Sequence, residues 1–247
     1  MRILMINPNT SASVTDRIAA TARAAANAGT EIVAVNAKVG VPYISTRAEA
    51  QIGGQAALEL LAEHSPGCDA VVIAAFGDPG LGGARELSPV PVVGMAEAAM
   101  LTSCMLGRRF AIVTFAPALA PWFREIVEYH GLTGRLAGIR TLEGSFASIA
   151  SVQDEKETLL VDLACRAVAE DDADVVILAG APLAGLAARV ADRIPVPVVD
   201  GVAASVKQAE ALAALKPHKA TVGTFRKPDL KPSSGLPPAL TRWISGE

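Results

Sequence analysis

The sequence has few of the features that mark disulfide, metal, nucleic-acid or membrane proteins. Its 247 residues include three cysteines, with no CxxC pair and no Cys/His cluster, so neither a disulfide framework nor a zinc site is encoded. The net charge of -3 leaves no excess of basic residues that would bind nucleic acid or anionic membranes. No apolar run approaches the roughly 20 residues that cross a bilayer, and the N-terminal run of four is too short for a signal peptide. We therefore expect a cytoplasmic protein with no nucleic-acid or membrane partner.

What the chain does have is the alternation typical of α/β proteins. Hydrophobic residues make up 51% of it, and short Val/Ile/Leu segments alternate with Ala-rich amphipathic stretches, which predicts βαβ units and a buried parallel sheet. Strands are expected at residues 2–6, 31–36, 70–74, 92–93, 110–114, 138–142, 175–179, 198–199 and 221–223. Helices are expected at residues 11–28, 48–63, 117–130, 155–170 and 203–215.

The sequence is also internally doubled. Residues 69–81 (DAVVIAAFGDPGL) align with residues 174–186 (DVVILAGAPLAGL), and the segment VPVVGMAEAA that follows the first copy corresponds to VPVVDGVAAS after the second. Residues 3–7 resemble residues 111–114 more loosely, at a similar offset of about 105. Any two βα units look somewhat alike, but three matched segments in the same order favour duplication.

A duplicated α/β chain predicts two pseudo-symmetric lobes, each a parallel sheet flanked by helices. We assign residues 1–97 plus 202–247 to the first lobe and residues 98–201 to the second. Ligands of open α/β sheets lie beyond the carboxyl ends of the strands, so the cleft between the lobes is the expected site. The Lys/Pro-rich tail, residues 216–238, is expected to wrap the body or a neighbouring subunit before a terminal helix around Trp243.

Three strand-end loops offer groups that suit a carbonyl or carboxylate ligand. Residues 7–11 (NPNTS) supply amides, hydroxyls and helix N-terminal N–H groups, although a plain helix cap is the alternative interpretation. Two asparagines around a proline exceed what capping requires. Residues 75–81 (AFGDPGL) contain glycines that let the backbone approach a ligand. Residues 180–185 (GAPLAG) carry no ionisable group and by themselves predict only a tight turn.

Other reactive residue types are interpreted as structural. His64 and His130 lie near predicted helix ends and His218 lies in a basic stretch, so capping or surface roles are favoured over catalysis. The cysteines fall in apolar helical patterns or a turn and indicate no reactive thiol. The glycines of residues 80–83 fit neither a dinucleotide fingerprint nor a phosphate loop.

The motifs together resemble the aspartate/glutamate racemase superfamily, and within it the hydantoin and allantoin racemase branch. The resemblance covers nearly the whole chain and rests on residues 6–11 (INPNTS), 76–81 (FGDPGL), 92–100 (VVGMAEAAM), 109–114 (RFAIVT) and 198–203 (VVDGVA). It implies an isomerase fold of two α/β lobes with no cofactor and no metal. It also implies a homo-oligomer and a small hydantoin-type or amino-acid-derived substrate between the lobes.

The sequence departs from this branch at the two catalytic positions. Racemisation needs a base on one face of an acidic carbon and an acid on the other, and the branch has one thiol before FGDPGL and one in the matching second loop. Those positions are Ala75 and Gly180 here, and neither can transfer a proton. The two-cysteine mechanism is therefore not available. Asp78 and Thr114 are the catalytic candidates that remain, although an Asp before Pro and Gly also simply closes a turn. Glu97 and Asp200 are interpreted as helix or loop braces.

Three functions stay open at this point. The first is a cofactor-independent enzyme acting on a hydantoin-type or amino-acid-derived carbonyl or carboxylate by racemisation, hydrolysis, decarboxylation or elimination. The second is a non-catalytic protein that binds a similar ligand, and the third is a structural protein that has inherited only the fold. For the first two, the predicted substrate-binding residues are Asn7, Pro8, Asn9, Thr10, Tyr43, Ser45, Thr46, Ala75, Phe76, Gly77, Phe115, Gly180, Ala181 and Pro182.

Overall fold

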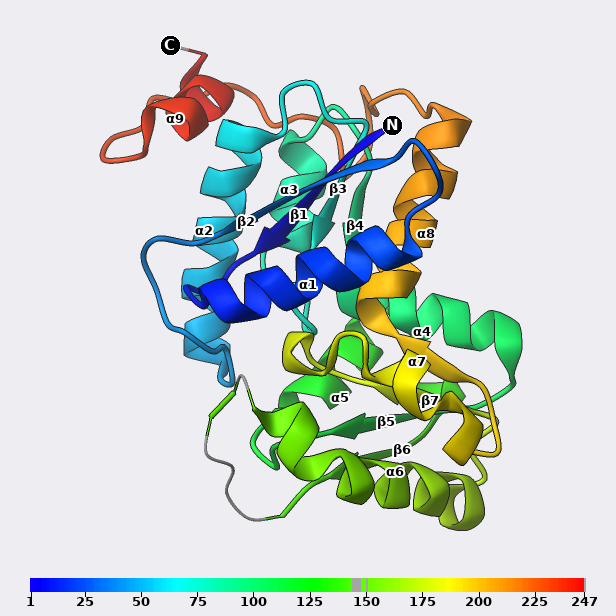
Figure 1. Cartoon of the computed structure of the whole chain (residues 1–247). Helices are drawn as coiled ribbons and strands as arrows, with labels where there is room; N and C mark the ends of the chain where they lie inside the picture. Colours follow the sequence, from blue (N-terminus) through cyan, green and yellow to red (C-terminus); the bar gives the residue numbers. More distant parts are fainter. Residues whose placement is uncertain (144–147, 150, 247) are drawn as a thin grey trace.

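The chain folds into two lobes, each built on a parallel four-stranded sheet (Figure 1). This computed structural model describes residues 1–143, 148–149 and 151–246. The first sheet has the order β2-β1-β3-β4 and the second the order β6-β5-β7-β8, so the two share one topology, as an internal duplication requires. The strands are β1 Arg2–Asn7, β2 Glu31–Asn36, β3 Ala70–Ile73, β4 Val92–Gly94, β5 Phe110–Thr114, β6 Leu136–Thr141, β7 Val175–Leu178 and β8 Val198–Asp200.

The inner strands of both sheets read as continuous apolar runs because helices cover both of their faces. Every residue of β3, β5 and β7 is buried, whereas the edge strand β6 is only half-buried. In register, Ile6 of β1 lies beside Ile73 of β3, and Val113 of β5 beside Leu178 of β7. The loops that follow each pair therefore leave their sheet at one edge, and this register places the candidate site.

The helices that surround the sheets include one that crosses back between lobes. They are α1 Ala12–Ala25, α2 Arg47–His64, α3 Leu81–Leu87, α4 Met95–Leu106, α5 Leu119–Tyr129, α6 Val152–Asp171, α7 Leu186–Val190, α8 Gly201–Leu215 and α9 Pro238–Ser245. Although α8 follows the second sheet in sequence, it packs against β3, α1 and α4 (Figure 1). The predicted lobe boundaries at residues 97/98 and 201/202 also assign α8 to the first lobe. The exact boundaries stay a prediction.

Two sequence expectations about elements need correction. Residues 221–223 form no strand: they lie in exposed bends, because Val222 has no partner strand and Gly223 takes a left-handed φ of +81°. Helices α3 and α4, and the short α7, are not among the helices expected from the sequence. The paired glycines of α3 resemble a loop, and α4 is apolar on nearly all sides, which hides its period.

The C-terminal tail lies on the chain's own first lobe. Lys219 Nζ donates to the carbonyl of Arg85. Helix α9 packs on α2 (Figure 1), and its own Leu240 is buried. Of the two placements expected for the tail, the body of the chain is thus the one observed. None of the helices within the described residues combines the length and apolar character needed to span a bilayer.

Candidate active site

Ala75 and Gly180 line one small cavity between the lobes, as the matched repeats predict. This inner cavity has a volume of about 30 Å³, which is room for one or two water molecules. Its walls are Asn9, Tyr43, Ile44, Ala75, Phe76, Phe115, Leu119, Trp122, Phe123, Gly180, Ala181 and Pro182. The strand-end loops of the two lobes therefore meet, and in this structure they meet in a nearly closed state.

The inner cavity unites only part of the predicted binding set. Asn9, Tyr43, Phe76 and Phe115 are at its wall with residues 180–182 and Ala75. The predicted residues that do not line it are Asn7, Pro8, Thr10, Ser45, Thr46, Gly77, Asp78 and Thr114. The wall that sequence reasoning missed comes mainly from α5, whose apolar stripe is indistinguishable from ordinary core in a single sequence.

The two asparagines of the first loop brace the loop itself. Asn7 Nδ2 donates to Asn9 Oδ1 at 2.9 Å and to Thr15 Oγ1 at 2.9 Å, and the backbone N–H of Ser11 donates to Asn9 Oδ1 at 2.9 Å. Thr10 is held by its backbone N–H, which donates to the carbonyl of Val41. With Oδ1 of Asn9 occupied in this way, its Nδ2 is the donor that remains for a ligand in the inner cavity.

Ser45 and Thr46 form the start of α2 instead of a wall of the inner cavity. Thr46 Oγ1 accepts from the backbone N–H of Glu49, while the Glu49 carboxylate accepts from the backbone N–H groups of Ser45 and Thr46. This is a capping box, which satisfies helix-end donors reciprocally. The bond from the Ser45 N–H is the main cause that lowers the pKa of Glu49.

Tyr43 brings the most conspicuous polar group to the inner cavity. Its hydroxyl is buried and has no hydrogen-bond partner among the described residues, while its ring lies 5.7 Å from that of Phe115, centroid to centroid. Burial, with a smaller contribution from the charge of Glu49, raises the pKa of Tyr43 well above its usual value of 10.0. The phenol is therefore a permanent hydrogen-bond donor at neutral pH, and a buried donor of this kind calls for an acceptor.

Thr114 is fully buried at the end of β5, where its hydroxyl has a structural partner. Thr114 Oγ1 donates to the carbonyl of Ala179 at 2.9 Å. The bond joins the end of β5 to the segment that leads into Gly180. The position thus supports the cavity from behind, and the catalytic role expected for Thr114 stays a prediction.

Asp78 follows the inner-cavity residue Phe76 by two positions and caps α4. Its Oδ1 accepts from the backbone N–H of Ala96 at 2.8 Å, and its Oδ2 accepts from that of Glu97 at 2.9 Å. Burial raises the pKa of Asp78, against His130 and these two N–H groups, which lower it. A Cβ at Gly94 would overlap this carboxylate, so the close approach needs glycine there. The contacts support the turn-closing alternative, and catalysis by Asp78 stays a prediction.

In the second lobe a carboxylate also caps the helix that matches α4, namely α8, but it comes from the end of β8. Asp200, at the end of β8, accepts from the N–H groups of Val202 and Ala203 with Oδ1 and from that of Gly185 with Oδ2 at 2.6 Å. Asp200 therefore braces its loop and helix, the role expected from the sequence. The duplication has kept a carboxylate at each helix N-terminus, where it interacts favourably with the helix dipole.

His130 is not the surface residue that its position near a helix end suggests. Its side chain is 9% exposed; Nε2 lies 3.7 Å from Asp78 Oδ2, and Nδ1 lies 3.7 Å from Glu97 Oε1. Within the part of the chain that the structure describes, His130 Nε2 makes no hydrogen bond. Arg85 pairs with Glu97 from the other side. This cluster joins the end of α5 to the first lobe, a contact that no local sequence pattern reveals.

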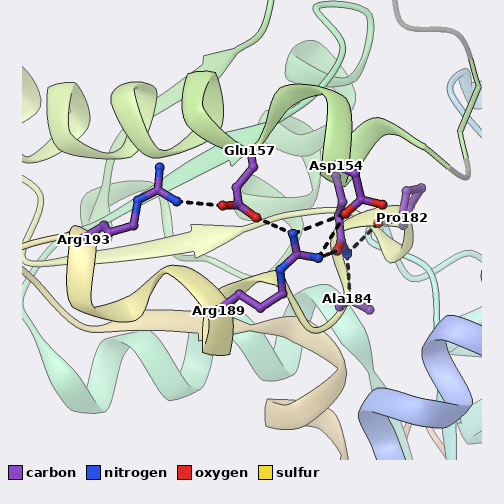
Figure 2. A network of polar contacts seen from close by, with 7 residues as sticks. Asp154, Glu157, Pro182, Ala184, Arg189 and Arg193 are labelled. Carbon is purple, nitrogen blue, oxygen red and sulfur yellow. Dashed lines mark hydrogen bonds and ion pairs between the residues drawn. The ribbon is translucent and has the colours of Figure 1, made fainter.

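The loop at residues 180–184 is held from outside by α6. Gln153 is 1% exposed, and its Nε2 donates to the carbonyls of Pro182 at 3.0 Å and Ala184 at 2.7 Å. Its Oε1 accepts from Arg189. Figure 2 shows Arg189 reaching Asp154 and Glu157 of α6, so the loop belongs to a connected polar network.

Gly180 stands at the second position where the resemblance implies a thiol, and its backbone conformation and surroundings favour glycine. Gly180 has φ +114° and ψ 138°, and a Cβ added there would lie 2.7 Å from Phe115 Cε1. The ring of Phe115 thus occupies the room that a side chain at residue 180 needs. Ala75, on the opposite wall, is 7% exposed.

Comparison with known proteins agrees with this geometry. A profile described as Asp/Glu/hydantoin racemase matches residues 3–209. A hydantoin racemase from Paenarthrobacter aurescens is 37% identical over 94% of this chain and 99% of its own, and one from Pseudomonas sp. (strain NS671) is 34% identical over 94% and 93%. The structure of allantoin racemase from Klebsiella pneumoniae superposes with a TM-score of 0.92 at 36% identity, covering 97% of this chain and 98% of that one. The chain therefore belongs to the Asp/Glu/hydantoin racemase family.

Proposed function

We propose that the protein binds a small, planar, carbonyl-bearing ring of the hydantoin type in the inner cavity and promotes its enolisation. The observation that carries the proposal is the buried, unpartnered hydroxyl of Tyr43 in a cavity shared by Ala75 and Gly180. The hydantoin and allantoin racemases among its relatives support the substrate class.

The lining of the inner cavity favours a neutral ring over an amino acid. Tyr43 is the one ionisable side chain among its lining residues, and none of them is cationic. A free carboxylate would be buried there without a countercharge, at considerable cost. Ring carbonyls match the two donors described above, Tyr43 O–H and Asn9 Nδ2. The inner cavity, at about 30 Å³, must widen before a planar ring enters beside Phe115.

Enolisation needs donors aimed at the carbonyl oxygen and a base for the carbon-bound proton; the lining of the inner cavity supplies the donors, and water serves as the base. The proton on the carbon next to the carbonyl passes to water, and the electron pair moves to the oxygen, where Tyr43 O–H stabilises the developing charge. Return of a proton from solvent to the opposite face inverts that carbon. Because no thiol stands at residue 75 or 180, we expect turnover well below that of a two-base enzyme.

The test is exchange of the ring C–H proton in D₂O, followed by NMR, together with calorimetric binding of the same hydantoin. Tyr43→Phe is expected to weaken binding by about 2- to 13-fold, the equivalent of roughly 0.5–1.5 kcal/mol for one hydrogen bond, and to slow exchange. The matched control is Tyr129→Phe, measured with unsubstituted hydantoin, since Tyr129 is exposed and does not line the inner cavity in which this ring is proposed to bind. Equal behaviour of the two variants would contradict the proposal.

A ligand-binding protein without turnover is the second candidate, favoured by the absence of an acid/base pair at Ala75 and Gly180. The same experiment separates the two functions. Tyr43-dependent binding without exchange above the buffer rate supports the binding protein. Exchange that Tyr43→Phe reduces supports the enzyme.

A further inference from the structure

A second, larger cavity lies on the far side of Trp122. This outer cavity has a volume of about 690 Å³ and is formed by α2, α5, α9 and the loop around residues 77–83. Trp122 is the single residue that lines both the inner and the outer cavity in the described part of the chain. Its indole is therefore the partition between a space that holds one or two waters and one large enough for a small molecule.

The indole is held in this position by packing alone. Trp122 is 6% exposed, and its ring lies 5.9 Å from that of Phe123, centroid to centroid. On another side it rests on the bare backbone of Gly77, where any Cβ would overlap it. The contacts with Phe123 and Gly77 are van der Waals contacts, which a rotation of the indole toward the outer cavity would exchange for others.

We propose that Trp122 is the residue that determines which ring substituents the site accepts. The inference rests on the proposed function: a hydantoin-type ring bound at Tyr43 carries a substituent that reaches past residue 122 into the outer cavity. With the indole in place the two cavities are separate, and a bulky substituent on the bound ring is excluded by steric overlap with Trp122. When the indole turns away, or is shortened, the two spaces become one.

The lining of the outer cavity includes Asp78, His130 and Gln51 as well as the aliphatic side chains that an apolar substituent would contact. Leu58, Ile126, Leu240 and Ile244 contribute aliphatic side chains to it from three helices. Ile126 stands four residues after Trp122 on α5, on the same face of the helix, so the wall continues directly from the partition. The substituent class is therefore aryl or branched alkyl, and each buried methylene contributes favourably to binding.

The experiment measures calorimetric affinities for hydantoin, 5-methylhydantoin and 5-benzylhydantoin in the full chain. For the unmodified protein we expect 5-benzylhydantoin to bind at least tenfold more weakly than 5-methylhydantoin. Trp122→Val is expected to raise the benzyl-to-methyl affinity ratio by tenfold or more. Ile126→Ala enlarges the outer cavity without opening the partition and should leave this ratio within about twofold. Trp122→Phe, a milder change, should give an intermediate gain and serves if the Val variant does not fold.

The outcomes separate this inference from the function on which it rests. An unchanged ratio in a folded Trp122 variant, with binding still weakened by Tyr43→Phe, overturns the inference alone. An equal gain in Ile126→Ala also overturns it, because the outer cavity would then be acting without the partition. Failure of every hydantoin to bind any variant overturns the proposed function and this inference with it.

Discussion

Gly180→Ala probes how the second lobe closes the inner cavity. Gly180 has φ +114° and ψ 138°, a region that is nearly exclusive to glycine, and forcing another residue into it costs about 1–3 kcal/mol. The new Cβ would also lie 2.7 Å from Phe115 Cε1, and such overpacking costs about 1–3 kcal/mol more. We therefore expect the free energy of unfolding to fall by about 2–6 kcal/mol.

A double-mutant cycle measured by urea unfolding separates the two costs. Phe115→Leu removes the ring edge, so in that background Gly180→Ala should cost only the backbone part, about 1–3 kcal/mol. The coupling energy is then about 1–3 kcal/mol. Gly131→Ala is the matched control, because Gly131 also has a positive φ, +69°, but has nothing within 4 Å of the added Cβ. If Gly180→Ala costs no more than this control and shows no coupling, the reasoning is refuted.

The same geometry limits any attempt to restore a thiol pair. Ala75→Cys with Gly180→Cys supplies one acid/base group to each face of a bound ring, but the second thiol competes with Phe115 for space. Racemisation of an enantiopure 5-substituted hydantoin, followed by polarimetry, is therefore expected to rise above the rate of the unmodified protein only when Phe115→Leu is added. Activity of Ala75→Cys alone would show that a single thiol serves both faces and would contradict the argument.

Three further predictions concern groups around the site. Asp78→Ala leaves two N–H groups of α4 without an acceptor, so chemical unfolding should show a loss of about 2–4 kcal/mol; a loss below 0.5 kcal/mol would argue against the capping role. Because burial raises the pKa of Tyr43, binding of a hydantoin methylated at its imide nitrogen should stay constant from about pH 7 to pH 10. The folded state should lose stability only above about pH 10, because there the tyrosine of the unfolded chain ionises before that of the folded chain. A fall in affinity centred near pH 10 would be inconsistent with this. Gln153→Met removes the bonds to Pro182 and Ala184 and should weaken hydantoin binding more than Tyr129→Phe does in the same titration.

Local patterns were enough to predict the architecture. The matched segments at residues 69–81 and 174–186 predict two lobes of equal topology, and the strand orders agree. The same alignment predicts that Ala75 and Gly180 face one cavity, as they do. Such features depend on the period of apolar residues and on strand ends meeting at one sheet edge, both of which can be read along the chain.

Sequence patterns could not predict the contacts between distant segments. His130 resembles a helix-end residue until α5 is packed against the first lobe, where Asp78 and Glu97 lie beside it. An isolated turn does not reveal that both oxygens of Asp78 meet the N-terminus of α4.

The sequence by itself determined the doubled α/β fold, the strand-end loops that meet between the lobes, and the absence of thiols at residues 75 and 180. Only the tertiary structure decided that Phe115 fills the space beside Gly180 and that Trp122 lines both the inner and the outer cavity. The physical reason is that backbone pattern and residue identity are local properties. The shape of a binding cavity, by contrast, depends on which side chains from remote segments occupy the same volume.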